Sequence, residues 1–204
     1  HEERRPQLML LGDRRGPMRF GTRTQLKVSL AVGQAIRLAY QARQQNMLTG
    51  CVSLEHNANW LQASQSAMGV HNIIQQLNRP CPPLGMTDTD YSLGSVLHEL
   101  TVRLTPGCII YLISDFHDLH EADGSALYHL AQHHQLYARH ILDPAELTLP
   151  AVGQLTLLDE QTGQTISIDT DNTSVSRQFA HDMQQQRQTI KTLLQNSCAE
   201  YQLR

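Results

Sequence analysis

Six consecutive residues, Asp115-Phe116-His117-Asp118-Leu119-His120, place four potential metal ligands close together in the sequence. Two of them are imidazoles, which suit Zn²⁺ or Ni²⁺. The spacing presets no coordination geometry, and a solvated acidic loop accounts for the same residues. We therefore expect a solvated loop and keep zinc or nickel binding as an alternative.

The same region holds the residue types of a hydrolase triad, Ser114, Asp115 and His117. Residues so close in sequence do not converge in the way that a triad usually does, and no G-x-S-x-G elbow surrounds Ser114. The sequence has no Walker A loop, and no G-x-G-x-x-G motif follows its first apolar run. We expect the scattered cysteines to be reduced thiols: Cys51, Cys81, Cys108 and Cys198. We predict that the chain is not an enzyme.

Basic residues crowd the start of the sequence, where seven of the sixteen Lys and Arg lie in the first 27 residues. Four of them gather near a predicted helix start: Arg14, Arg15, Arg19 and Arg23. Free N–H groups at a helix start bind phosphate, so a phosphate-ligand sensor or hydrolase that uses this arginine cluster is one alternative. Between positions 88 and 123 seven acids face a single base, and the arginines could instead neutralise that stretch. The net charge of -3 argues against nucleic acid as a partner.

Apolar patterns predict strands that alternate with helices. We expect strands at 7–12, 49–55, 59–63, 108–114 and 136–142, and a hairpin of 154–158 and 165–168 around a turn at 160–163. We expect helices from Thr22 or Thr24 to about 45, then at 64–77, from Ser92, at 125–134, and from about 174 through Tyr201. Lys27 falls on the polar stripe of the first helix. The uninterrupted apolar run at 108–114 is typical of a central parallel strand.

This order of elements predicts an α/β fold, because strands joined by right-handed helical crossovers lie parallel. We expect one domain over residues 1–204, with a doubly wound, mostly parallel sheet, helices on both faces, a C-terminal β-hairpin and a long final helix. The functional crevice of such sheets lies beyond the carboxyl ends of the central strands. The loops at 13–21 and 115–124 are therefore the most informative.

No stretch approaches the ~18 continuous apolar residues that would cross a membrane, and the first residues are charged. We expect no membrane insertion and a cytoplasmic location. The sequence begins at His1 without a methionine, so we expect it to be the C-terminal part of a longer protein.

Two segments carry a resemblance to a known family. The first joins His1-Glu2-Glu3-Arg4-Arg5-Pro6, an apolar strand, Asp13 and Met18-Arg19-Phe20-Gly21-Thr22-Arg23, and the second is Leu112-Ile113-Ser114-Asp115-Phe116-His117-Asp118-Leu119. With the Asp143-Pro144 step, the hairpin and the final helix, they resemble domain-of-unknown-function family 58 over essentially the whole chain. The resemblance implies a von Willebrand factor A-like, Rossmann-like fold and a bacterial protein. It also implies association with MoxR-type AAA+ ATPases as a substrate-recruiting or chaperone-like partner.

Domains of this fold often hold Mg²⁺ or Mn²⁺ through an Asp-x-Ser-x-Ser turn, a hydroxyl from a second loop and an aspartate from a third. The resemblance would make Asp13, Ser92 (or Thr89) and Asp115 these ligands, since hard cations prefer oxygen. In this chain the turn has lost both of its hydroxyl positions, to Arg15 and Pro17.

The lost hydroxyls indicate a degenerate metal site that holds no cofactor. We expect Arg15 or Arg14 to replace the cation by pairing with Asp13 and Asp115, because guanidinium and carboxylate groups form strong two-point contacts.

Three functions remain in order of preference. The first is a non-catalytic protein-interaction module whose loops present seven residues to a MoxR-type AAA+ ATPase or to a protein that it remodels: Asp13, Arg14, Arg15, Ser92, Asp115, His117 and Asp118. The second is a divalent-metal-dependent adhesion domain. The third is the phosphate-ligand sensor or hydrolase.

Overall fold

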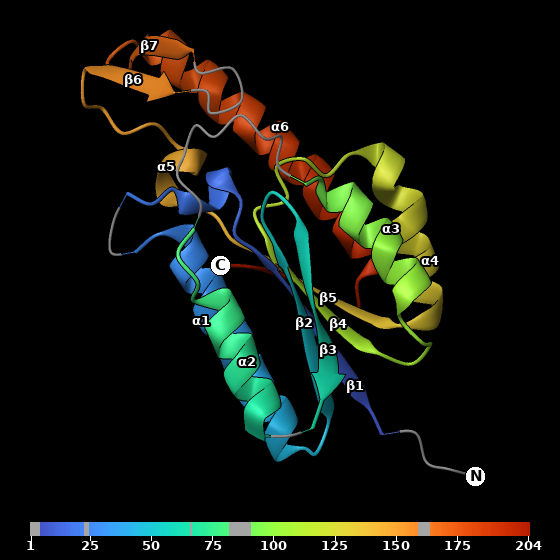
Figure 1. Cartoon of the computed structure of the whole chain (residues 1–204). Helices are drawn as coiled ribbons and strands as arrows, with labels where there is room; N and C mark the ends of the chain where they lie inside the picture. Colours follow the sequence, from blue (N-terminus) through green and yellow to red (C-terminus); the bar gives the residue numbers. More distant parts are fainter. Residues whose placement is uncertain (1–4, 23–24, 66, 82–90, 159–163) are drawn as a thin grey trace.

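The computed structural model of the chain describes residues 5–22, 25–65, 67–81, 91–158 and 164–204, and every structural statement below concerns these residues. Thr24, Thr89 and the predicted turn at 160–163 lie outside them. A six-stranded sheet with the order β3-β2-β1-β4-β5-β8 forms the centre of the fold (Figure 1). The expected doubly wound, mostly parallel sheet is confirmed.

Five strands of this sheet are parallel: β1 (Gln7–Asp13), β2 (Leu48–Leu54), β4 (Ile109–Ser114), β5 (Gln135–His140) and β8 (Glu200–Leu203). Strand β3 (Ala58–Ser64) is antiparallel to β2. The chain reverses direction across the sheet between β1 and β4, since β1 leads to β2 on one side and β4 leads to β5 on the other. The carboxyl ends of β1 and β4 therefore meet at the switch point where such folds place their sites.

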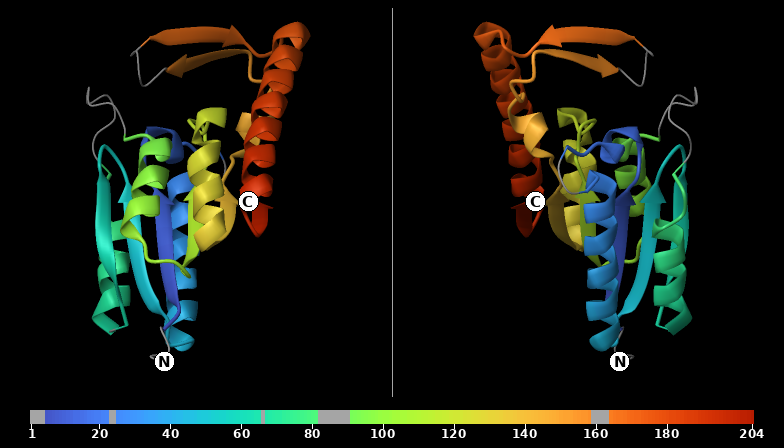
Figure 2. Two further views of the ribbon diagram at one scale, coloured as in Figure 1. Left: turned by 90° about the vertical axis from the view of Figure 1, so that its right-hand side faces the viewer. Right: turned by 90° about the vertical axis from the view of Figure 1, so that its left-hand side faces the viewer.

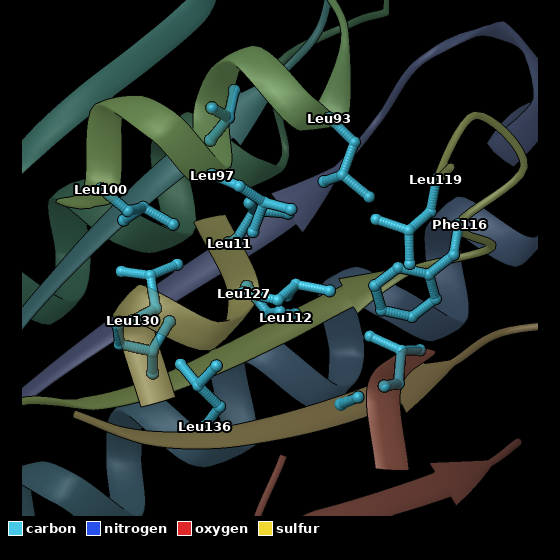
Figure 3. Packing of buried hydrophobic residues seen from close by; sticks show 14 of the residues in the cluster. Leu11, Leu93, Leu97, Leu100, Leu112, Phe116, Leu119, Leu127, Leu130 and Leu136 are labelled. Atoms are coloured by element: carbon cyan, nitrogen blue, oxygen red, sulfur yellow. The ribbon is translucent and has the colours of Figure 1, made fainter. Parts of the chain in front are cut away.

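Helices cover both faces of the sheet (Figure 1). On one face lie α1 (Lys27–Gln44) and α2 (Ala67–Leu77), and on the other lie α3 (Leu93–Arg103), α4 (Gly124–His133) and α6 (Thr173–Ser197). Each face has its own core, and the one under α3 and α4 is rich in leucine (Figure 3). None of the helices in the described part of the chain is both long and apolar enough to cross a bilayer.

Short elements border the carboxyl edge of the sheet. They are the 3-10 helices η1 (Gly16–Arg19) and η2 (Glu121–Asp123) and the single-turn helix α5 (Pro144–Leu147). Beyond them, β6 (Gln154–Leu158) and β7 (Thr165–Asp169) form a separate hairpin that adjoins the start of α6, away from the sheet (Figure 2).

Two predicted helix ends are wrong. Helix α6 ends at Ser197, and Tyr201 lies in β8, because the backbone there pairs with β5 through Ala199 N–H and the Leu136 carbonyl, 2.7 Å apart. Helix α1 begins at Lys27 after Leu26, so Thr22 does not cap it. Thr22 instead donates its backbone N–H to the carboxylate of Asp143, over 2.8 Å.

Candidate functional site

Arg15 holds the carboxyl edge of the sheet together. Its Nε and Nη2 donate to the two oxygens of Asp13, at 3.0 and 2.7 Å. Its Nη1 and Nη2 donate to Asp118 at 2.6 and 2.9 Å, and Nη1 also reaches the carbonyl oxygen of Tyr91 at 3.3 Å. These five contacts use all five N–H donors of the guanidinium. One side chain therefore joins the end of β1, the residue before Ser92 and the loop after β4.

The Arg15 contacts are shielded from water. Asp13 is 0% and Arg15 1% exposed. Burial disfavours the charge of Arg15, but the carboxylates of Asp13 and Asp118 outweigh it and raise the pKa of the guanidinium. Burial likewise disfavours the Asp118 carboxylate, yet its hydrogen bonds and attraction to Arg15 lower the pKa of Asp118. Both partners thus stay charged near neutral pH.

Asp13 has a second partner at the end of β4. The hydroxyl of Ser114 donates to Asp13 Oδ2 over 2.6 Å and accepts the backbone N–H of Phe116 over 2.9 Å. Ser114 is fully buried. Its hydroxyl is thus turned to Asp13, and the residue types of a hydrolase triad do not form one here.

A second charged cluster surrounds Asp115. Lys27 Nζ lies 2.8 Å from Asp115 Oδ2 and 2.5 Å from Glu146 Oε1, and Nδ1 of His117 lies 2.8 Å from Asp115 Oδ1. Burial disfavours the Asp115 carboxylate, but the hydrogen bond to His117 and the charge of Lys27 hold the pKa of Asp115 below its usual range. Burial disfavours the charged forms of Lys27 and His117 too, yet the neighbouring carboxylates raise both of their pKa values.

The expected pairing of Arg15 with Asp13 is seen, but the second partner of Arg15 differs from the prediction. Arg15 binds Asp13 and Asp118, whereas Asp115 binds Lys27. Lys27 belongs to the polar stripe predicted for the first helix, yet its side chain is buried, with the residue 3% exposed. The reason is that Lys27 is the first residue of α1 and lies at the carboxyl edge of the sheet, where Asp115 and Glu146 surround its ammonium group.

Arg14 points away from the Arg15 cluster. It binds Glu55 Oε1 at 2.5 Å, the carbonyl of Gln76 at 3.0 Å, the carbonyl of Arg79 and the sulfur of Cys81. Arg14 and Arg15 therefore do not share a phosphate site. Arg23, another member of the predicted arginine cluster, lies outside the described residues.

Ser92 and the loop at 115–120, for which zinc binding was the alternative, do not assemble a metal site among the described residues. The hydroxyl of Ser92 caps α3 by accepting the N–H of Ser95 over 3.1 Å. Asp118 is taken by Arg15, and the backbone N–H of His120 binds Asp123. Within the described ranges, no three His, Cys, Asp or Glu side chains lie close enough together to hold a metal ion.

The residues present do not fit the divalent cation that the fold often carries. Both oxygens of Asp13 accept hydrogen bonds from Arg15, which brings a positive charge to the turn. Asp115 faces the ammonium of Lys27 instead of Asp13. Ser92 is exposed at this edge, but its hydroxyl accepts the N–H of Ser95 and so caps α3 instead of facing Asp13 or Asp115.

Backbone strain shapes the loop after β4. Phe116 has a φ of 56°, a left-handed conformation that costs about 1–3 kcal/mol for a bulky side chain. The cost is offset by burial of its ring, whose centroid lies 5.5 Å from that of His140 in an edge-on arrangement. Through this turn the loop directs Asp115 to Lys27 and Asp118 to Arg15.

Sequence reasoning missed Lys27, Glu146 and Asp143 as members of the edge. A signal for two of them was present, because Asp143 and Glu146 form a capping box around Pro144, with the spacing that marks a helix start. Nothing in the sequence marks Lys27, since a lysine at a helix start is more often solvated.

Substitution of Arg15 by Ala should lower the free energy of unfolding by about 3–5 kcal/mol, because it leaves the buried Asp13 carboxylate without its partner. Arg15→Lys should recover only part of this loss, since an ammonium cannot make the paired contacts of a planar guanidinium. Urea denaturation measures both. Arg37→Ala, at an exposed position of α1, is the matched control and should stay within about 0.5 kcal/mol of the unaltered chain. A loss of less than 1 kcal/mol for Arg15→Ala would contradict the structural role.

Mg²⁺ and Mn²⁺ should leave the melting temperature of the chain unchanged at millimolar concentration. A cation that binds only the folded state raises the melting temperature, and at this edge it would have to displace Arg15 from Asp13. Thermal melts with and without either ion check this, and a sample that contains a chelator such as EDTA is the metal-free reference. Sub-micromolar binding of Mg²⁺ in calorimetry would show that the guanidinium does not exclude the metal.

Acid should destabilise the fold through His140. Burial lowers the pKa of His140 from 6.5 to about 4, so the unfolded chain binds more protons than the folded chain between these values. Stability should therefore fall as the pH drops from 6.5 to 4, by up to about 3 kcal/mol from this group. His140→Asn can still form a hydrogen bond with Tyr201 but takes up no proton, and its pH dependence should be flatter. The exposed His98→Asn should keep the original slope, and equal slopes for all three proteins would refute the assignment.

Comparison with known proteins connects this architecture to a family. The sequence matches the family described as "Protein of unknown function DUF58" over residues 1–189. A search among curated proteins found no significant match.

Solved structures agree on the fold. The conserved hypothetical protein BatB from Bacteroides thetaiotaomicron has a TM-score of 0.57 at 16% identity, over 93% of this chain and 99% of that one. An aerotolerance-related membrane protein from Bacteroides fragilis has a TM-score of 0.54 at 13% identity, over 93% and 99% of the two chains. A von Willebrand factor type A protein from Catenulispora acidiphila has a TM-score of 0.51 at 15% identity, over 93% of this chain and 43% of that one.

At such identities the solved structures speak for the fold alone, while the family match extends over nearly all of the sequence. Both agree with the resemblance inferred from the loops after β1 and β4. The chain belongs to the DUF58 family of proteins of unknown function and has a von Willebrand factor A-like fold.

Proposed function

We propose that the chain is a non-catalytic protein-interaction module that uses the carboxyl edge of its sheet to bind a MoxR-type AAA+ ATPase or a protein that this ATPase remodels. An ATP-driven partner would place it in the cytoplasm. The observation that carries the proposal is the Arg15 clamp, which joins three loops at this edge without leaving a donor free.

A rigid edge suits recognition. Loops that are tied together lose little conformational freedom when a partner binds, so less of the interaction energy is spent on ordering them. Asp13, Arg14 and Arg15 are buried, and we assign them to holding the loops in place. Ser92 is exposed, and His117 and Asp118 have side chains that are 29% and 22% exposed, so these three are the residues that we place against the partner.

Several observations argue against catalysis. The hydroxyl of Ser114 is buried and engaged by Asp13. Burial raises the pKa of the Cys51 and Cys198 thiols to about 12, and a nucleophilic cysteine needs a low pKa. Lys27 is held in its charged form by two carboxylates, so it is neither a base nor a nucleophile.

The two alternatives have less support. A metal-dependent adhesion domain needs an available Asp13, and Arg15 occupies both oxygens of that carboxylate. A phosphate site built on the N-terminal arginine cluster needs converging guanidinium groups, and those of Arg14 and Arg15 are bound to different partners.

The proposal predicts direct binding of the purified chain to a purified MoxR-type AAA+ ATPase from the same organism, with an affinity that changes when Mg-ATP is added. His117→Ala should weaken this binding about tenfold, the effect of losing roughly 1.4 kcal/mol at the centre of an interface. Biolayer interferometry with the immobilised chain measures both effects.

His98→Ala, at an exposed position in the middle of α3, is the matched control and should bind like the unaltered protein. A thermal melt of each variant separates loss of contact from loss of fold. If the unaltered chain binds the ATPase in neither nucleotide state, the partner is wrong. If both variants bind equally well, the contact lies elsewhere.

A further inference from the structure

A cavity of about 70 Å³ lies beside the Asp115 cluster, between the carboxyl ends of β4 and β5 and the helices α5 and α6. Its walls include the polar side chains of His117, His140, Glu146 and Arg187 and the apolar side chain of Met183. Its rim is accessible, since the side chains of His117 and Glu146 are 29% and 28% exposed. A single water needs about 10–15 Å³ of such space, so the cavity is large enough for a small polar group.

The carboxylates of the cavity already have partners. Asp115 binds Lys27 and His117, and Glu146 binds Lys27 and the backbone N–H of Asp143. Nδ1 of His140 forms a hydrogen bond with the hydroxyl of Tyr201 over 2.8 Å, and burial lowers the pKa of His140 and so favours its neutral form. The wall thus offers no unpaired anion among these groups.

Arg187 is different. It is half-buried on α6, in line with the apolar residues Met183, Ile190 and Leu194. No hydrogen bond or ion pair joins it to any other residue in the described part of the chain, although its charge is close enough to act on His140 and Tyr201. Arg187 lines the cavity and has no ion pair in the described part of the chain, so an anion bound in the cavity would supply the counter-charge that it lacks there.

We propose that Arg187 binds an oxyanion, a carboxylate or a phosphate group, in this cavity. A guanidinium recognises both groups through paired N–H donors. The site is distinct from the Arg15 clamp, and it does not depend on the proposed ATPase partner.

Calorimetric titration with inorganic phosphate and, separately, with acetate tests the site, at constant ionic strength set by sodium chloride. At least one probe should bind saturably, and Arg187→Gln should weaken that binding about tenfold or more, as expected for loss of hydrogen bonds to a charged group. Since Arg187 has no partner in the described chain, R187Q should fold with unchanged or higher stability in the absence of a probe.

Arg177→Gln, at an exposed position of the same helix, removes an equal charge and should bind like the unaltered chain. Preference for phosphate would indicate a phosphorylated or free phosphate ligand, and preference for acetate would indicate an acidic side chain or another carboxylate. The proposal is overturned if neither probe binds saturably, or if R187Q and R177Q bind as well as the unaltered chain. No ATPase takes part, so this result and the test of the partner are independent.

Discussion

The contact between Arg15 and Asp13 is the constraint on which the carboxyl edge of this protein depends. A buried carboxylate at the end of a central strand is unfavourable unless a cation faces it, and in this chain the cation is supplied covalently, two residues further on. The same guanidinium reaches Asp118 and the Tyr91 carbonyl. Three loops that are far apart in the sequence therefore have one common anchor, and none of them can move without breaking a charged hydrogen bond.

Lys27 repeats this solution one position further along the edge. It faces Asp115, directly after β4, and Glu146 in α5, so the start of α1 is tied to both of these elements. Two internal cations thus serve the carboxylates that a divalent ion would otherwise have to balance. The side chains of Arg15 and Lys27 are part of the chain, so, unlike a bound metal ion, they cannot dissociate from these carboxylates. They also remove the open coordination position through which a metal could capture a partner's carboxylate.

The sequence was sufficient for the sheet and for part of the site. The run at 108–114 identified the central strand β4, and the loss of hydroxyls at Arg15 and Pro17 led to the prediction that a guanidinium pairs with Asp13. It could not tell whether Arg15 would pair with Asp115 or Asp118. These two lie three residues apart in one loop, and the left-handed turn at Phe116 decides which way each carboxylate points.

Other errors have the same origin, which is that local pattern is overridden by contacts distant in sequence. The spacing of Leu194, Cys198 and Tyr201 is that of a helix. Tyr201 nevertheless lies in a strand, because the backbone of β8 pairs with the edge of β5. Lys27 follows the polar periodicity of α1, yet two carboxylates from other elements bury it.

Because the Arg15 contacts engage the charged groups after β1, the charged side chains that can still bind a ligand lie at another part of the carboxyl edge. At the end of β1 every donor of the Arg15 guanidinium is used and the side chains of Asp13, Arg14 and Arg15 are buried, so this part supports structure. In the cavity beside the ends of β4 and β5, Arg187 of α6 lacks a partner in the described chain, and His117 is partly exposed. The function of this fold usually centres on the switch point between β1 and β4. In this chain the accessible charged groups, Arg187 and His117, lie one strand away, beside α6. A ligand or partner that recognises this protein should therefore contact α6 together with the loop after β4, and a variant at the β1 turn should affect recognition only through the stability of the edge.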